Sequence, residues 1–240
     1  MAQAAISASI AASGEATGIS DKPRWRWAGG LGLAHIVLML GAFATEQVDQ
    51  AQHGTTPASV LHVYAGVSVS RVELASYVEA IAFLPLLAAL VLLTRLLGRR
   101  TETGRVAAQT ALGLGIAYVA STFAIGFPPL TAAVYAAHHG VDAATVTTVN
   151  DLRNYGFLLQ VALSLAFALA LGIAATAEHR LTRWVGWGGI ALGVVGLVVT
   201  PFAHNAMSLA WMIWWVGACV LCLKGGPKDV AVADSSVRAV

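Results

Sequence analysis

Ser70–Leu97 reads SRVELASYVEAIAFLPLLAALVLLTRLL, and this stretch decides the fold. Its apolar run exceeds the roughly 20 residues that a membrane-spanning helix needs, so it predicts a span over 71–97. Glu79 lies inside it. An ionisable residue inside a span costs about 2.5–3.5 kcal/mol on insertion scales and is a functional-site candidate. Pro85 has no N–H to donate to the carbonyl of Ile81, which predicts a bend close to Glu79.

The composition of the whole chain agrees with this interpretation. The 240 residues are 58% hydrophobic and 11% charged, whereas soluble domains carry about 25% charged residues. The net charge of +2 is small and its basic residues form no single patch, so no nucleic acid is expected as a partner. Two cysteines cannot make a disulfide framework. The chain is therefore predicted to be a multi-pass membrane protein with the lipid bilayer as its main partner.

Six segments are long and apolar enough to be spans: 25–45, 71–97, 106–126, 152–177, 184–202 and 206–223. Short or polar connections join them. We expect an all-α transmembrane bundle of six helices, forming one domain over 24–223. The polar segments 1–23 and 224–240 are predicted to be disordered tails.

The basic residues predict the orientation of this bundle. Every Lys and Arg except Arg71 and Arg153 falls in a tail, in the second or fourth connection, or in the end of a span next to one of these. The positive-inside rule then predicts that both termini lie in the cytoplasm, with the protein in the plasma membrane. Trp25, Trp27, Trp184 and Trp187 fall at the same inner boundary, as an aromatic belt would.

Two longer outer connections are predicted, 46–70 and 127–150. The first contains Thr56-Pro57, an N-cap followed by proline at the first helical position, which predicts a short surface helix. The second contains Pro128-Pro129 and then Asp142, which is placed to cap a long fourth helix.

The two acids of the second span receive different interpretations. Glu73 follows Ser70 by three residues, the capping-box pattern of a helix start. Glu79 has no such role and is a candidate for ligand binding or proton relay, with Tyr77 nearby. The alternative is a hydrogen-bonded structural Glu79 that holds helices together.

The fourth span supplies candidate partners for Glu79. One of its faces is polar along its length: Asn150, Arg153, Phe157, Gln160 and Ser164. A buried Glu79–Arg153 pair supported by Gln160 is one hypothesis. In the other, Arg153 reaches the outer headgroups and pairs with Asp151.

Further candidates come from the first and last spans. His35 lies in mid-span, either in support of Glu79 or as a satisfied core histidine. Glu46 reads as a helix-end residue in water. Trp211 and Trp215 share a face that could line a pocket near Glu79 and stabilise a cation, or could serve as belt and packing residues.

No cofactor or metal is expected. His138 and His139 are adjacent and point apart on a helix, and no histidine pair has the spacing of a metal site. Cys219-x-x-Cys222 lies in an apolar helix, outside the strand-turn context of a redox motif, and reads as two small apolar residues.

Glycine-rich stripes predict close helix packing rather than chemistry. In the fifth span the stripe is Gly186, Gly189, Gly193, Gly196 and Thr200, and in the third it is Gly113, Ala117 and Ser121.

Several short motifs carry a resemblance: Arg26-Trp27-Ala28-Gly29-Gly30, Asn150-Asp151-Leu152 and Leu181-Thr182-Arg183-Trp184-Val185-Gly186-Trp187. Through them the chain resembles a large group of uncharacterised six-span bacterial integral membrane proteins. The resemblance implies a plasma-membrane location and no activity. In size, hydrophobicity and isolated acids the chain is also similar to small integral-membrane terpene cyclases.

Three functions stay open at this point. The first is a membrane protein with an outward-facing polar cavity. The cavity would bind or move a proton, a lipid or a small ligand that is either hydrophobic or ionic. The second is a membrane-embedded enzyme that uses Glu79 as general acid on an isoprenoid or lipid. The third is an assembly protein whose polar stripes only fix helix register. The catalytic residues, the substrate and the oligomeric state are not predicted.

Overall fold

A computed structural model describes residues 21–46, 55–179 and 181–226, and across those ranges the chain is helical with no strand. The predicted all-α class is confirmed. The predicted tails, 1–23 and 224–240, fall almost wholly outside the described residues. The helices are α2 (Lys22–Glu46), α3 (Pro57–Ala65), α4 (Val69–Leu97), α5 (Glu102–Ile125), α6 (Phe127–His138), α7 (Ala143–Glu178) and α8 (Arg183–Leu223).

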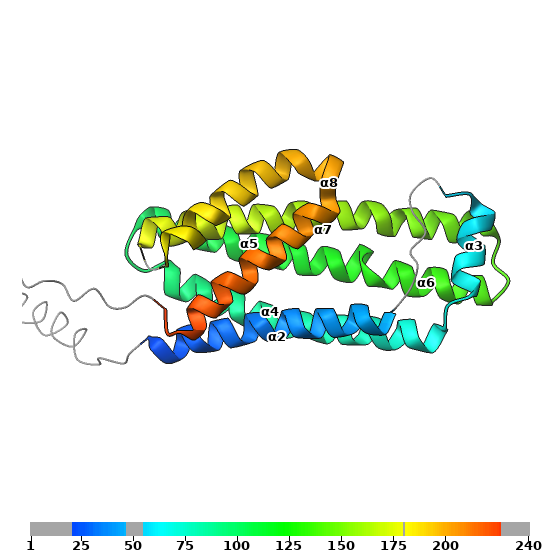
Figure 1. Cartoon of the computed structure of the whole chain (residues 1–240), viewed down its shortest axis with the longest axis horizontal. Helices are drawn as coiled ribbons and strands as arrows, with labels where there is room; N and C mark the ends of the chain where they lie inside the picture. Colours follow the sequence, from blue (N-terminus) through cyan, green and yellow to red (C-terminus); the bar gives the residue numbers. More distant parts are fainter. Residues whose placement is uncertain (1–20, 47–54, 180, 227–240) are drawn as a thin grey trace, which may run out of the picture.

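The long helices lie side by side in one elongated bundle, with α3 and α6 at one end (Figure 1). The beginning of α2, the end of α4, the beginning of α5, the end of α7 and both ends of α8 gather at the other end. The side chain of Arg99 hydrogen-bonds Asp21 there at 2.8 Å. We call this the basic end, and the end with α3 and α6 the distal end.

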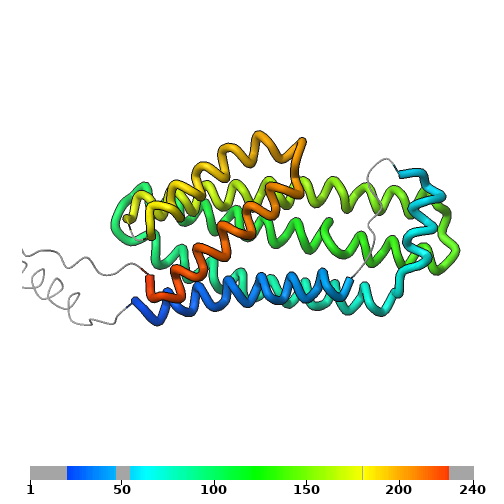
Figure 2. The backbone as a smooth tube through the Cα atoms, in the orientation of Figure 1, coloured from blue at the N-terminus to red at the C-terminus, as the bar shows by residue number. Residues whose placement is uncertain are grey.

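The helix lengths are those of a multi-pass membrane protein. Within the described ranges, five helical stretches are long and apolar enough to cross a membrane, with α5 and α6 counted as one of them. The 41 residues of α8 form a hairpin rather than one rod, because Ala203 has non-helical angles (φ −147°, ψ 46°) just after Pro201. Figure 2 shows the two arms of α8 running back to the same end. The two last predicted spans are these two arms.

Side-chain contacts confirm that the arms of α8 are antiparallel neighbours. The indole Nε1 of Trp214 donates to the carbonyl of Val185 at 3.1 Å. A Cβ at Gly217 would lie 2.5 Å from the ring of Trp184. The predicted packing stripe is also confirmed, since Gly186, Gly189, Gly193 and Gly196 all lie against α7.

The prediction that 127–150 is an outer loop is wrong for its first half, which is helical. Phe127–His138 is helix α6, which continues α5 after a break at Gly126 (φ −86°, ψ −101°). Proline at the first positions of a helix fits because the first N–H groups have no intrahelical partner. Pro128 and Pro129 therefore begin α6 and end the hydrogen-bond ladder of α5. The predicted cap of α7 by Asp142 is confirmed, with a 3.0 Å bond from the Thr145 amide.

The distal end extends beyond the length of a membrane span. About 20 residues, or roughly 30 Å, cross the apolar layer. Counted from Leu97, this length reaches Tyr77 in α4, and counted from Val106 it reaches Gly126 at the end of α5. The helical residues beyond this boundary, together with α3, form what we call the distal cap.

The distal cap has a hydrophobic core of its own, separate from that of the bundle: Val60, Tyr64, Val72, Leu130, Ala133, Val134 and Val146. The short helix predicted at Thr56-Pro57 is α3, which supplies two of these residues. The main core of the bundle is built from leucine, alanine and aromatic side chains of α2, α4, α5, α7 and α8.

Two local predictions are corrected. The N-cap of α4 is Ser68 rather than Ser70, and Glu73 is exposed, so the capping box does not form. In α5 the close packing is made by Gly115, against Leu90, while Gly113 has no atom within 4 Å of an added Cβ. Small residues occur on more than one face of α5, so their spacing does not determine which face packs against another helix.

Candidate functional site

A buried ion pair joins α2 to α7 at the distal boundary of the bundle. Nη2 of Arg153 donates to Oε1 of Glu46 at 3.3 Å. The two side chains are only 14% and 7% exposed. The sequence predicted that Glu46 would be a helix-end residue in water, and this is wrong. It lies at the helix end, but Arg153 and the neighbouring helices cover it.

A second carboxylate, Glu79 of α4, lies beside this pair. Its residue is 8% exposed, and the charges that act on it are Glu46 and Arg153. No described residue makes a hydrogen bond or ion pair with Glu79 itself. Arg153 is therefore paired with Glu46 in the structure, while the predicted Glu79–Arg153 relation is one of electrostatic proximity.

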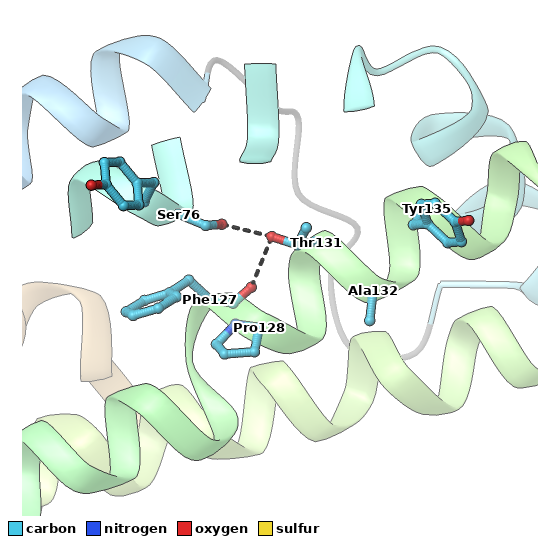
Figure 3. A pocket seen from close by; sticks show the side chains of 7 residues that line it. Ser76, Phe127, Pro128, Thr131, Ala132 and Tyr135 are labelled. Atoms are coloured by element: carbon cyan, nitrogen blue, oxygen red, sulfur yellow. Dashed lines mark hydrogen bonds between the residues drawn. The ribbon is translucent and has the colours of Figure 1, made fainter. Parts of the chain in front are cut away.

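The neighbours of Glu79 along α4 locate it opposite the break between α5 and α6. One turn before it, the hydroxyl of Ser76 is 2.6 Å from that of Thr131 in α6 (Figure 3). One turn after it, the ring of Phe83 stacks on Phe127 with centroids 6.5 Å apart. Glu79 lies between these contacts, and so at the level of the first turn of α6, just after the break.

The break leaves backbone acceptors without helical donors. The carbonyls of Ala124 and Ile125 would pair with the amides four residues on, which are Pro128 and Pro129 and carry no N–H. Helix α7 approaches closely here, because a Cβ at Gly156 would lie 2.5 Å from the carbonyl oxygen of Ile125. Irregular backbone at membrane depth is tolerated where protein covers it.

Two polar side chains lie deeper in the bundle on the same turns of α4. The hydroxyl of Tyr118 interacts electrostatically with Glu79, and its ring lies 5.7 Å from that of Phe83. Nδ1 of His35 donates to the carbonyl of Ala82 at 2.8 Å, which fixes the neutral ring with its lone pair on Nε2. His35 is thus a satisfied core residue that also lies near the candidate site.

The polar face of α7 is buried as predicted, and two of its amides lack acceptors. Asn150 accepts from the hydroxyl of Tyr64 through Oδ1, while its Nδ2 has no partner among the described residues. Nε2 of Gln160 also has none, and it lies against Gly126 at the break. Unpartnered buried donors are uncommon in folded proteins, and here they flank Arg153 on both sides.

The other predicted site residues are Tyr77, Trp211, Trp215 and Asp151. Tyr77 is 65% exposed and lines a shallow apolar groove of about 550 Å³ between α4 and α6. Trp211 and Trp215 are buried and stacked 6.1 Å apart, with Trp211 against Tyr118. Asp151 is partly exposed and follows Asn150 on α7. Glu79 lines neither this groove nor the hollow at the basic end.

Sequence reasoning missed two polar side chains. Tyr118 lies near Glu79 in the candidate site, and Glu178 lies at the basic end. Tyr118 lies within an apolar stretch of α5 where no pattern separates it from packing aromatics. Glu178, at the end of α7, is 1% exposed and accepts from the amides of Arg100 and Thr101 at 3.0 and 2.9 Å. It fastens the connection between α4 and α5 at the basic end. The only signal in the sequence was that Glu178 follows directly after the apolar stretch of α7.

Metal binding receives no support from the described residues, where no three His, Cys, Asp or Glu side chains group to hold an ion. Cys219 and Cys222 are buried and free, facing Gly29 and Gly32 of α2. Their small side chains let α2 and α8 pack closely, in line with the packing interpretation.

The fold and the buried charge cluster define a class: a helical multi-pass membrane protein with ionisable groups at the distal boundary of its spans. No family model, no curated protein and no solved structure matches the chain.

Proposed function

We propose that this protein binds a proton at the cluster of Glu46, Glu79 and Arg153 and moves it between the distal face and the interior of the bundle. The observation that carries the proposal is that two buried carboxylates share one guanidinium, and only Glu46 is bonded to it. Charges cost far more in a low-dielectric site than in water. Taking up one proton brings these three groups to neutrality.

The surroundings of the cluster support a route for that proton. On the distal side the cluster lies next to the end of α2 and the break at Gly126. Discontinuous helices place free backbone carbonyls beside ion sites in many transporters. Toward the interior, Tyr118 and then His35 lie along the same turns of α4, and both side chains can accept and donate protons.

We place the protein in the plasma membrane with both termini in the cytoplasm, so that the distal cap faces outward. The basic residues at the end opposite the cap support this orientation through the positive-inside rule. In that orientation, Glu79 exchanges its proton with the outside.

Proton flux into proteoliposomes tests the proposal. Vesicles carrying an internal pH-sensitive dye receive an acid step, with wild-type protein, Glu79→Gln or Glu73→Gln. Glu73 is an exposed acid on the same helix and provides the matched control. We expect Glu79→Gln to reduce the flux to that of empty vesicles and Glu73→Gln to retain it. Equal flux in wild type and Glu79→Gln would overturn the proposal.

The enzyme alternative has less support. A lipid or isoprenoid cyclase would need a pocket that brings the acid and the shielding aromatics to one substrate. Glu79 and Trp211 line neither of the two hollows described. The flux assay also tests the assembly alternative. A protein whose polar residues only fix helix register would carry no proton flux that depends on Glu79.

A further inference from the structure

A small hollow at the basic end combines three hydrogen-bond donors with an apolar wall. It has a volume of about 290 Å³ and lies where α7 ends and α8 begins. His179, Thr182 and Arg183 supply the donors, and Leu181, Gly186 and Trp187 form the wall. It lies at the opposite end of the bundle from the charge cluster, so it is independent of the proposed function.

The three donors lack acceptors among the described residues. Thr182 is the N-cap residue of α8, yet its hydroxyl makes no capping hydrogen bond. The imidazole of His179 and the guanidinium of Arg183 are exposed and make no ion pair or side-chain hydrogen bond with any described residue. The neighbouring carboxylate, Glu178, is directed away to the amides of Arg100 and Thr101. The hollow therefore presents donors that no protein anion satisfies.

The chemistry of the hollow fits a phosphate group. An arginine fork, a hydroxyl and an imidazole match the oxygens of a phosphate with charge-assisted hydrogen bonds. The basic side chains collected at this end of the bundle attract anions in general, and the hollow adds a concave surface lined by three residues with donor groups.

The apolar wall of the hollow indicates that the phosphate belongs to a lipid headgroup rather than to a soluble molecule. Trp187 and Trp184 are 60% and 52% exposed, as expected for indoles at the boundary between lipid chains and headgroups. Trp187 lines the hollow itself. Lipid headgroups at such a boundary reach basic pockets between helices.

We propose that this hollow is a binding site for the phosphate headgroup of an anionic phospholipid. The phosphate accepts hydrogen bonds from Arg183, Thr182 and His179, and the glycerol and first methylenes lie on Leu181 and Trp187. Phosphatidylglycerol represents this chemistry, and phosphatidylcholine with the same acyl chains is the matched neutral lipid.

Native mass spectrometry of the full chain in detergent measures this binding. We expect the wild type to retain phosphatidylglycerol in clear preference to phosphatidylcholine. Arg183→Ala should weaken phosphatidylglycerol binding about tenfold, the effect of losing a charge-assisted hydrogen bond. Arg183→Lys should restore part of it, because the charge returns without the fork. Arg26→Ala removes an exposed arginine at the same end, outside the hollow, and should retain wild-type binding.

Three results would overturn the proposal. Arg183→Ala could bind like the wild type, or Arg26→Ala could lose as much as Arg183→Ala, which would indicate a diffuse charge effect. Free glycerol 3-phosphate could displace the lipid at matched concentration, which would assign the hollow to a soluble phosphate. Size-exclusion profiles of the variants establish that each one is folded.

Discussion

Arg153 and Glu46 are 107 residues apart in sequence and form a buried ion pair of 3.3 Å between α7 and α2. Glu79 of α4 completes a group of three ionisable side chains contributed by three helices. The pair fixes the distal end of α2 to α7, while Glu79 is held by position rather than by a bond. Protonation of Glu79 can therefore change without breaking the contact between helices.

Removing the guanidinium should destabilise the protein strongly. Arg153→Met removes the guanidinium that is paired with Glu46 and lies near Glu79, and breaking a buried pair in this way costs about 3–5 kcal/mol. We expect a marked fall in the thermal midpoint measured in detergent. The triple variant Glu46→Gln, Glu79→Gln, Arg153→Met removes all three charges and should recover much of the loss. A triple variant as unstable as Arg153→Met would contradict the electrostatic explanation.

Glu178 should be essential to the basic end of the bundle. Its carboxylate accepts from the amides of Arg100 and Thr101 and from the Thr101 hydroxyl, at 2.9 to 3.1 Å. Glu178→Ala removes all of these hydrogen bonds, and a hydrogen bond to a charged acceptor contributes about 1.5–3 kcal/mol. Thermal unfolding should show the loss, with Glu178→Gln intermediate. Glu102→Gln changes an exposed acid of the same region and should have little effect.

The approach of α7 to the α5–α6 break should tolerate no side chain. A Cβ at Gly156 would lie 2.5 Å from the Ile125 carbonyl, and overpacking of this kind costs about 1–3 kcal/mol. Gly113→Ala is the control, because no atom lies within 4 Å of the added Cβ. We expect Gly156→Ala to lower the thermal midpoint and Gly113→Ala to leave it unchanged or slightly raised. Similar midpoints for the two variants would mean that α7 has room to move.

The distal cap should loosen without the bundle when Tyr64 loses its hydroxyl. Asn150 is fully buried, and the hydroxyl of Tyr64 donates to its Oδ1. Tyr64→Phe removes that donor, at a cost of about 1–3 kcal/mol for the buried amide. Hydrogen exchange should quicken in α3 and in the first turns of α4 and α7, while amides of α2 and of α4 after Pro85 stay protected. Uniform quickening across the bundle would contradict a separate distal cap.

Much of the fold follows from the sequence because lipid imposes long apolar helices. The spans, the small-residue stripe of α8 and the capping by Asp142 were all readable from local pattern. The helical continuation at Pro128-Pro129 was not, since the same residues also suit a loop. The extension of α4 and α7 into a cap depends on contacts between distant segments, such as Tyr64 with Asn150, and no local pattern specifies them.

The candidate site was predictable only in part. Glu79 and Arg153 stand out because charges are rare in spans. The partner of Arg153 depends on how α2 is placed against α7, and periodicity does not determine this. Glu46 therefore read as a solvated helix end, although it forms the pair. Glu178 escaped notice for the same reason, because its partners are backbone amides of another connection.

The central claim is that the cluster holds one proton, and infrared difference spectroscopy of the protein in lipid nanodiscs tests it most directly. A protonated carboxyl group has its own C=O stretching band, distinct from that of a carboxylate. The account predicts that wild type shows one buried protonated carboxyl that titrates with pH, and that Glu79→Gln abolishes this band while Glu73→Gln retains it. A band unchanged by Glu79→Gln, or no titrating band in the wild type, would contradict it.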